Sequence, residues 1–357
     1  MRYQLSMPEP HSHLFQVEIR LDADGPVELA MPSWTPGSYL MREFARHVQN
    51  FSAECDGAPV AWQKVSKSVW RVEAPTGREL TVRYRVYANE TSVRTSHLDS
   101  THGYVNGASV FLFVRGREQE PIELEIDAPE DWRATTSLPA RGDFHFTARN
   151  YDELVDSPVE IGTHTLLEWE QEGVPHRYAI WGRGNYDADR LVADTRRIIA
   201  AESEMFGGLP YDQYTFILHL LPEGRGGLEH AASSSLQASR WTFEGEQYED
   251  FLALVAHEFF HVWNAKRIRP EVLGPFDYTA ENYTRNLWVV EGLTTYYTDL
   301  MIRRAGIISE ERYLKRLADS IGRMQMLPGR RHQTLEESSF DTWIRFYRPD
   351  EHTPNSQ

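Results

Sequence analysis

The chain has 357 residues, of which 41% are hydrophobic and 12% aromatic, a composition typical of folded globular proteins rather than disordered chains. Its 53 acidic residues outnumber its 37 basic ones and give a formal net charge of -16, which disfavours nucleic acid as a partner. The length predicts two domains, because single domains commonly contain about 100–200 residues.

The sequence shows no signal for export or membrane insertion. The first residues, Met1–Pro8, lack the apolar core of a signal peptide, and no apolar run reaches the roughly 18 residues that span a bilayer. The single cysteine, Cys55, cannot form a disulfide within the chain, and we expect it to be a small buried residue. These features predict a cytoplasmic protein without membrane contact. They leave the oligomeric state open.

Residues 1–172 are predicted to form an N-terminal antiparallel β-sandwich domain. Apolar and polar residues alternate in Phe15–Leu21, Leu80–Tyr87 and Ile122–Ile126, the pattern of half-buried strands. Turn-forming stretches such as Asp22–Pro26 separate these segments. Many short strands without long helices between them favour a sandwich.

Residues 173–357 are predicted to form a second domain in which helices alternate with short strands. Asp187–Phe206 places its apolar residues near one helical face, and the glycines that follow end this helix. Thr215–Leu221 is predicted to be an apolar strand. Two further helices are expected at Glu246–Asn264 and Trp288–Arg304. The fold class is therefore α+β with two domains.

The first of these two helices contains the sequence His257-Glu258-Phe259-Phe260-His261. Histidines four residues apart lie on one face of a helix, so both imidazoles can ligate one metal ion. Glu258, beside the first histidine, can take a proton from an attacking water molecule. Two ordinary histidines on a structural helix are the alternative, because the motif also occurs by chance.

A catalytic zinc ion needs a third protein ligand and one open position. The best candidate is Glu291, which opens the sequence EGLTTYY on the next predicted helix. Two helices joined by a loop can bring this carboxylate opposite the histidine pair. Together the two segments predict one Zn²⁺ per chain, held by His257, His261 and Glu291.

Two further acidic residues are candidates for roles around this site. Glu229 lies in the segment Gly226–His230, where an edge strand can pair with a peptide and Gly227 permits close approach. Glu229 is predicted to bind a free substrate amine, although an exposed turn is the alternative. Asp299 is a candidate partner for a ligand histidine, or else a surface residue. Other histidines, including His97 and His102, are expected to be structural.

These segments resemble the glycyl aminopeptidase family, a branch of the gluzincin zinc peptidases. The resemblance implies a β-sandwich followed by a thermolysin-like catalytic domain, and removal of N-terminal residues with Gly and Ala favoured. It also implies zinc ligation by His257, His261 and Glu291, acid–base catalysis by Glu258, and amine binding by Glu229. The matching segments are HEFFHVWNAKRIRP (His257–Pro270), LWVVEGLTTYY (Leu287–Tyr297), GGLEH (Gly226–His230) and MPSWTPGSYLMREFARHV (Met31–Val48).

The family pattern continues beyond the segment that resembles Trp343–Ser356 in this chain, into further catalytic-domain helices. One of these helices carries a tyrosine that hydrogen-bonds the oxyanion. The catalytic domain is therefore expected to be incomplete at its C-terminus. Loss of one such donor costs about 100–1000-fold in turnover.

The sequence thus predicts a zinc-dependent aminopeptidase whose partners are peptides with free amino termini. A zinc endopeptidase is one alternative, in which Glu229 binds no amine. A zinc-bound peptide-binding protein with little or no activity is another. The intact Glu258 argues against it, whereas the expected loss of C-terminal helices argues for it.

Overall fold

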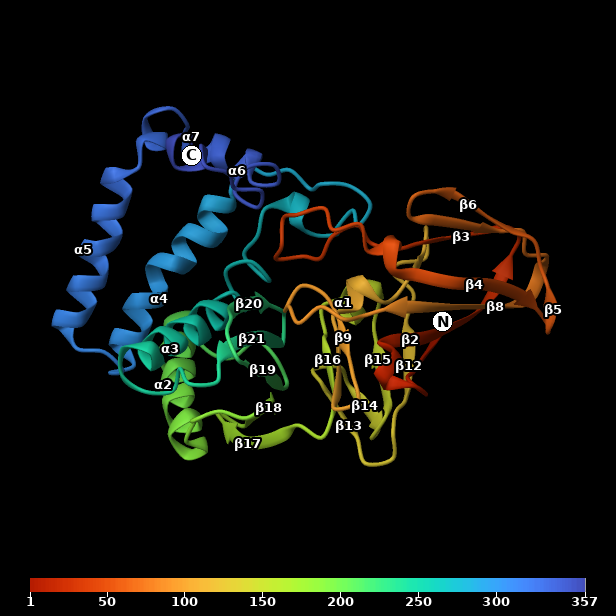
Figure 1. Cartoon of the computed structure of the whole chain (residues 1–357), viewed down its shortest axis with the longest axis horizontal. Helices are drawn as coiled ribbons and strands as arrows, with labels where there is room; N and C mark the ends of the chain where they lie inside the picture. Colours follow the sequence, from red (N-terminus) through yellow and green to blue (C-terminus); the bar gives the residue numbers. More distant parts are fainter. Residues whose placement is uncertain (357) are drawn as a thin grey trace. The chain divides into compact units, whose positions relative to one another are not determined.

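The computed structural model describes residues 1–356, and residue contacts divide the chain into two compact units (Figure 1). The first unit comprises Met1–Thr165 and Asp277–Ala280, and the second comprises Leu166–Phe276 and the residues from Glu281 onward. The division falls before the predicted domain boundary at residue 172. The reason is that β17 (Thr165–Gln171) belongs to the sheet of the second unit.

Strands dominate the first unit. Helical turns are short there, namely α1 (Tyr151–Val155), η1 (Pro10–Ser12), η2 (Phe44–His47) and η3 (Gly107–Ser109). The strands are β1 (Arg2–Ser6), β2 (Leu14–Asp24), β3 (Val27–Ala30), β4 (Val48–Cys55), β5 (Ala58–Pro59), β6 (Trp62–Ser66), β7 (Val69–Val72), β8 (Thr76–Tyr87), β9 (His97–Leu98), β10 (His102–Val105), β11 (Phe113–Val114), β12 (Ile122–Asp127), β13 (Arg133–Thr136), β14 (Ala140–Gly142), β15 (His145–Ala148) and β16 (Val159–Gly162).

These strands form one eight-stranded sheet, in the order β14-β15-β12-β1-β2-β8-β4-β5, and two four-stranded sheets, β13-β16-β10-β9 and β11-β3-β7-β6. The alternation read from the sequence is confirmed, because Phe15, Val17 and Ile19 of β2 are buried and pair with residues of β8. The prediction of an antiparallel sheet is wrong at one place. β1 pairs with β12 in parallel, since the N-terminal strand inserts between β12 and β2.

The second unit is built on a five-stranded sheet with the order β17-β18-β19-β21-β20. β18 (Val174–Trp181), β19 (Tyr214–Leu221) and β21 (Ser233–Ser239) are parallel, and β20 (Arg225–Glu229) pairs antiparallel with β21 at the edge. Helix α2 (Ala188–Phe206) connects β18 to β19. Its ends follow the predicted signals. Asp187 caps the first turn, and Gly207 adopts the left-handed conformation after the last residue.

Helix α3 (Gly245–Phe260) packs its apolar side against this sheet. The ring of Phe259 lies 5.0 Å from that of Tyr214 and 6.0 Å from that of Phe216, both on β19. The helix ends at Phe260, before the predicted end at Asn264, and His261 is its cap residue. The remaining elements of this unit are η4 (Glu271–Leu273), η5 (Trp288–Gly292), α4 (Leu293–Arg304), α5 (Glu310–Met326), η6 (Pro328–Arg331), α6 (Leu335–Asp341) and α7 (Thr353–Ser356).

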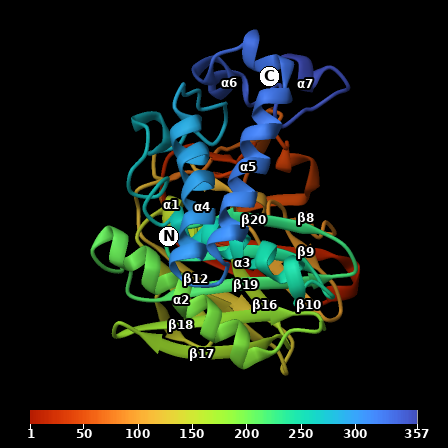
Figure 2. The same ribbon diagram turned by 90° about the vertical axis from the view of Figure 1, so that its left-hand side faces the viewer.

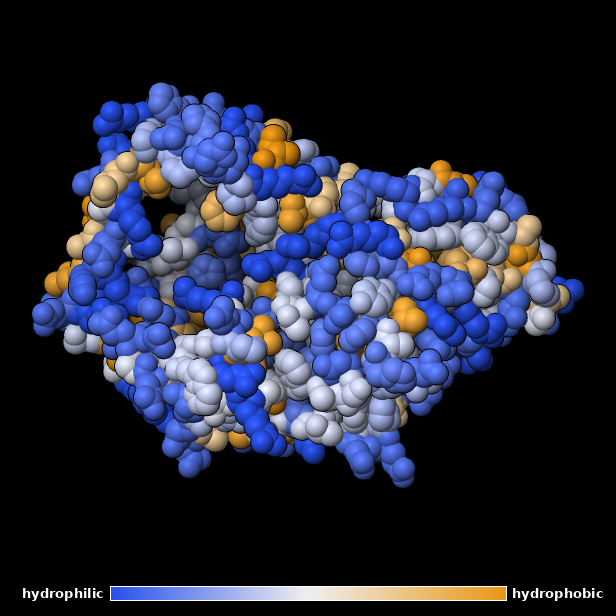
Figure 3. Space-filling view, viewed as in Figure 1, coloured by the Kyte–Doolittle hydropathy of each residue, from blue (hydrophilic) through white to orange (hydrophobic). Residues whose placement is uncertain are grey.

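Helix α5 lies beside α4 (Figure 2); none of its residues is buried, and ion pairs connect it to neighbouring elements. Arg312 pairs with Glu249 at 2.9 Å and Arg316 with Asp299 at 2.7 Å. Apolar residues of α5 remain exposed, and Figure 3 shows a hollow next to this helix. None of the helices described in residues 1–356 has the length and apolar character needed to cross a membrane.

Candidate active site

The two histidines of the HExxH motif meet at the C-terminal end of α3. Their Nε2 atoms lie 3.2 Å apart, and their rings are nearly perpendicular, with centroids 4.8 Å apart. His261 is 1% exposed as a side chain, whereas His257 is 23% exposed. The buried neighbours Phe259 and Phe260 anchor the helix in the core, so that the histidine face turns toward the site.

Each histidine is oriented through its other ring nitrogen. Thr298 lies 3.3 Å from Nδ1 of His257 and donates its own hydroxyl proton to the carbonyl of Thr294, so it accepts a hydrogen bond from His257. Nδ1 of His261 donates to the main-chain carbonyl of Asn264 at 2.8 Å. Both Nδ1 atoms therefore carry a proton, so in the neutral imidazoles the two Nε2 lone pairs face each other.

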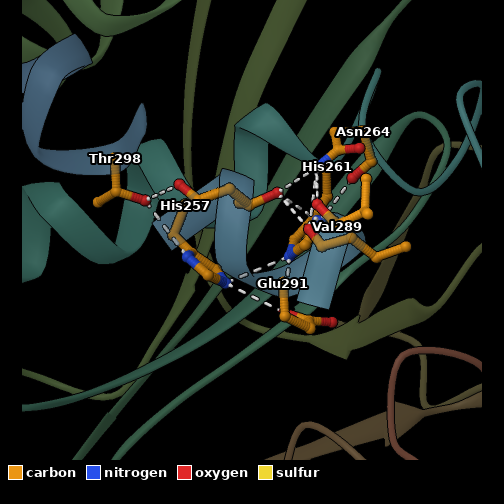
Figure 4. A network of polar contacts seen from close by, with 8 residues as sticks. His257, His261, Asn264, Val289, Glu291 and Thr298 are labelled. Atoms are coloured by element: carbon orange, nitrogen blue, oxygen red, sulfur yellow. Dashed lines mark hydrogen bonds and ion pairs between the residues drawn. The ribbon is translucent and has the colours of Figure 1, made fainter. Parts of the chain in front are cut away.

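Glu291 brings a carboxylate to these two lone pairs. Its Oε2 lies 3.7 Å from Nε2 of His257 and 3.5 Å from Nε2 of His261 (Figure 4). The three residues form a group whose ligand atoms all lie within 4.8 Å of one another. Two facing lone pairs and a carboxylate repel one another unless a cation lies between them, and two histidines with one glutamate suit Zn²⁺. The residues present thus fit the expected metal.

The electrostatics of His261 agree with this need for positive charge. Burial lowers the pKa of His261, but the carboxylates of Glu291 and Glu229 outweigh it and raise the pKa to about 10. The acidic groups around this imidazole therefore favour a cation at this position, whether that cation is a proton or a metal ion.

Glu258 is buried next to the histidine pair and lies against β20. A Cβ atom added to Gly227 would lie only 1.9 Å from Oε1 of Glu258, so only glycine allows this close approach. Burial raises the pKa of Glu258 to about 7, although the two histidines act in the opposite direction. The carboxyl group can therefore both accept and release a proton near neutral pH.

Glu229, at the end of β20, approaches the same centre. It is 5% exposed, and its ligand atom forms a group with those of Glu258 and His261 within 4.8 Å of one another. The edge position of β20 is consistent with the expected edge strand, because β20 pairs with β21 on one side only in the described sheet. The alternative of an exposed turn at Glu229 is wrong.

The expectation for Asp299 requires a correction. Its carboxylate accepts a hydrogen bond from Nε of Arg316 at 2.7 Å and so fastens α5 to α4. The position next to His257 is taken instead by the hydroxyl of Thr298. The two residues are adjacent on one helix, and a rotation of about 100° per residue separates the directions of their side chains.

Sequence reasoning missed Asn264, Thr294 and Thr298. Thr294 and Thr298 follow Glu291 by three and seven positions, a spacing that places them on its helical face, whereas Asn264 follows His261 by three positions, beyond the end of α3. This spacing was an available signal. A fourth missed residue is Glu202 on α2, which is fully buried. Neither of its carboxyl oxygens has a hydrogen-bond partner among the described residues.

Comparison with known proteins gave two family matches and several similar structures. Residues 2–163 match the peptidase M61 N-terminal domain, and residues 250–357 match the M61 glycyl aminopeptidase domain. A crystal structure of an aminopeptidase N family protein from Idiomarina loihiensis is 36% identical, with a TM-score of 0.96. The match covers 99% of this chain and 63% of that protein, so the chain spans less than two thirds of its length.

More distant structures share the fold. An M1 zinc metallopeptidase from Deinococcus radiodurans is 18% identical, with a TM-score of 0.60, over 96% of this chain and 78% of that one. A mutant of that enzyme bound to a Tyr-Ser-Ala substrate is 17% identical, with a TM-score of 0.59, over 96% and 79%. The comparison with curated proteins gave no match. The predicted fold class, a β-rich domain followed by a zinc-peptidase-like region, is thereby confirmed.

Proposed function

The chain belongs to the M61 glycyl aminopeptidase family, and from this premise we propose that it is a zinc-dependent aminopeptidase. The observation that carries the proposal is the opposition of the His257 and His261 lone pairs at 3.2 Å with Glu291 beside them. This arrangement needs a cation, and the acidic groups that bind a substrate amine and activate water lie next to it.

His257, His261 and Glu291 would hold the zinc ion, which as a catalytic metal also needs one position that the protein leaves open. A zinc ion held there would supply Lewis-acid polarisation of the scissile carbonyl and a lowered pKa for the attacking water. Thr298 and Asn264 keep both imidazoles in the tautomer that leaves Nε2 free for the metal.

Glu258 is the proposed general base and then general acid. Its carboxylate accepts a proton from the attacking water and passes it to the nitrogen of the leaving amine. A pKa near 7 suits both transfers, because each requires a group that changes protonation state around neutral pH. Gly227 keeps the strand β20 close to this carboxylate.

Glu229 is the proposed binding group for the free amino terminus of the substrate. Its ligand atom lies within 4.8 Å of those of Glu258 and His261, a distance comparable to the roughly 3.3–3.6 Å that one extended residue spans, so we place one residue between the bound amine and the scissile bond. Cleavage would therefore remove one residue at a time. By the family resemblance, that residue is preferentially Gly or Ala.

The test is hydrolysis of glycyl- and alanyl-p-nitroanilide by protein loaded with zinc. We expect turnover of the free-amine substrates and none of an N-acetylated substrate. A chelator should abolish this turnover, and Glu258→Gln should reduce it by about 100–10,000-fold. Glu229→Gln keeps the shape of the side chain but removes its charge, and it should raise KM for free-amine substrates more than it lowers kcat.

Two other outcomes would replace this proposal. Equal cleavage of acetylated peptides would indicate an endopeptidase and would leave Glu229 without its role. Stoichiometric zinc without any turnover, together with measurable peptide affinity, would indicate a peptide-binding protein that keeps the metal site.

A further inference from the structure

Glu291, the third candidate ligand, lies in a helical turn that is not α-helical. Glu291 lies in η5, a π-helical turn that runs directly into α4. A π-turn contains one residue more than an α-turn and occurs mostly as a single turn inside an α-helix, frequently at functional sites. The extra residue changes the direction of the side chains around it, so the aim of Glu291 depends on this turn being kept.

Side-chain donors hold the carbonyl groups immediately before Glu291. The amide Nδ2 of Asn264 lies 3.0 Å from the carbonyl oxygen of Val289 and 2.9 Å from that of Val290. The hydroxyl of Thr294 also donates to the carbonyl of Val290, at 2.7 Å, and accepts a hydrogen bond from Asn264 at 3.0 Å. The π-turn is therefore fastened by a side chain that comes from a different segment.

The main chain of the same residue orients a histidine ligand. The carbonyl of Asn264 accepts the hydrogen bond from Nδ1 of His261 at 2.8 Å, and Asn264 is only 6% exposed. Figure 4 shows Asn264 next to His261 and above Val289, with Glu291 beneath the two imidazoles. One residue thus links the end of α3 to the turn that carries Glu291.

We propose that Asn264 is a positioning residue that sets the spacing between His261 and Glu291, and with it the affinity of the site for zinc. The proposal rests on the proposed function, because it assumes that these residues ligate zinc. Among side chains of this size, only an amide donates to two carbonyls. An aspartate would place acceptor oxygens against the carbonyls of Val289 and Val290.

The experiment compares zinc affinity, by competition with a chromogenic chelator, between the parent protein and Asn264→Asp. This variant keeps the main-chain carbonyl that orients His261 and has nearly the same shape. We expect zinc affinity to fall by about 10–100-fold, as for other groups that orient metal ligands. The visible spectrum of the cobalt-loaded protein should also change, because that spectrum reports coordination geometry.

A matched control is Asn185→Asp. The side-chain oxygen of Asn185 accepts a hydrogen bond from the main-chain nitrogen of Phe243, a contact that a carboxylate retains. Zinc affinity should be unchanged in this variant. A zinc affinity of Asn264→Asp within twofold of the parent, in folded protein, would overturn the proposal.

If Asn264→Asp does not fold, Thr294→Val decides the matter. It removes the hydroxyl that accepts from Asn264 and donates to the carbonyl of Val290 while keeping the side-chain volume, and Thr294→Ser is the variant that restores this hydroxyl. Weaker zinc binding by the valine variant, rescued by serine, supports the proposal, and unchanged binding by valine refutes it. If the parent protein itself binds no zinc, the proposed function fails, which is a result distinct from either of these.

Discussion

Two pairs of neighbouring histidines in this protein consist of the same residue types but differ in their hydrogen bonds. In the second unit, His257 and His261 face each other through Nε2 at 3.2 Å, beside Glu291. In the first unit, Nδ1 of His97 lies 3.0 Å from Nε2 of His102, whose Nδ1 lies 2.8 Å from the buried Glu160. Both pairs thus combine two imidazoles with a carboxylate.

The difference lies in the direction of the donors. In the first unit, His102 donates to Glu160 and therefore accepts from His97, so a proton lies in each of these two contacts. Oδ1 of the nearby Asp99 already accepts from Thr101 and from the main chain of His102. In the second unit, Thr298 and Asn264 accept both Nδ1 protons, and two lone pairs are left facing each other. The hydrogen-bond partners of the imidazoles therefore indicate the candidate metal site more clearly than the presence of two histidines does.

The largest expected effect comes from removing a candidate ligand. His257→Ala should lower zinc affinity by more than about 100-fold, because it deletes one of the three candidate protein ligands. This loss exceeds the one expected when a residue that only orients a ligand is replaced. The measurement is zinc per chain after dialysis against a weak chelator. If His257→Ala retained one zinc per chain, the comparison between the two histidine pairs would fail.

The next effect concerns the pair in the first unit. His102→Ala should lower the free energy of unfolding by about 3–5 kcal/mol, because it leaves the buried Glu160 without its hydrogen-bond donor from His102. Zinc per chain should not change. Urea unfolding measures the first effect, and His11→Ala, at an exposed histidine of the same unit, is the matched control. A loss of bound zinc in His102→Ala would contradict the structural role.

A smaller effect is expected at the support of His257. Thr298→Val removes the hydroxyl that accepts the hydrogen bond from Nδ1 of His257 and should weaken zinc binding by about 10-fold. This is the lower end of the effect expected for groups that orient metal ligands, because the contact is 3.3 Å long. Thr298→Ser keeps the hydroxyl and should bind zinc as the parent does. Equal affinities for the valine and serine variants would show that Thr298 does not orient the histidine.

The last effect concerns stability alone, at Glu202, a buried carboxyl for which the described residues provide no hydrogen-bond partner. Burial raises its pKa well above the usual 4.5, and His261 only partly opposes this. The folded protein therefore keeps a proton that the unfolded chain releases above pH 4.5, so stability falls as pH rises. Glu202→Gln cannot titrate. Its stability relative to the parent should increase by roughly 1 kcal/mol per pH unit between pH 5 and 7, measured by urea unfolding. A pH-independent difference would contradict this assignment.

Much of this protein could be predicted from local patterns alone. The alternation in β2 and β8, and the capping signals of α2 at Asp187 and Gly207, report preferences that the chain carries at each position. The spacing of His257 and His261 likewise follows from the repeat of a helix. Glu291 was selected from its sequence context, and the structure brings it to the same centre, while the roles of these residues stay predictions.

Tertiary structure decided the features that depend on distant segments. The parallel pairing of β1 with β12, the place of β17 in the second sheet, and the π-turn at Glu291 leave no periodic signal in the sequence. The choice of Thr298 over Asp299 beside His257 has the same origin, because it depends on how α4 is rotated against α3. Periodicity reports which face of an element is apolar, whereas the partner of a polar side chain is set by long-range packing.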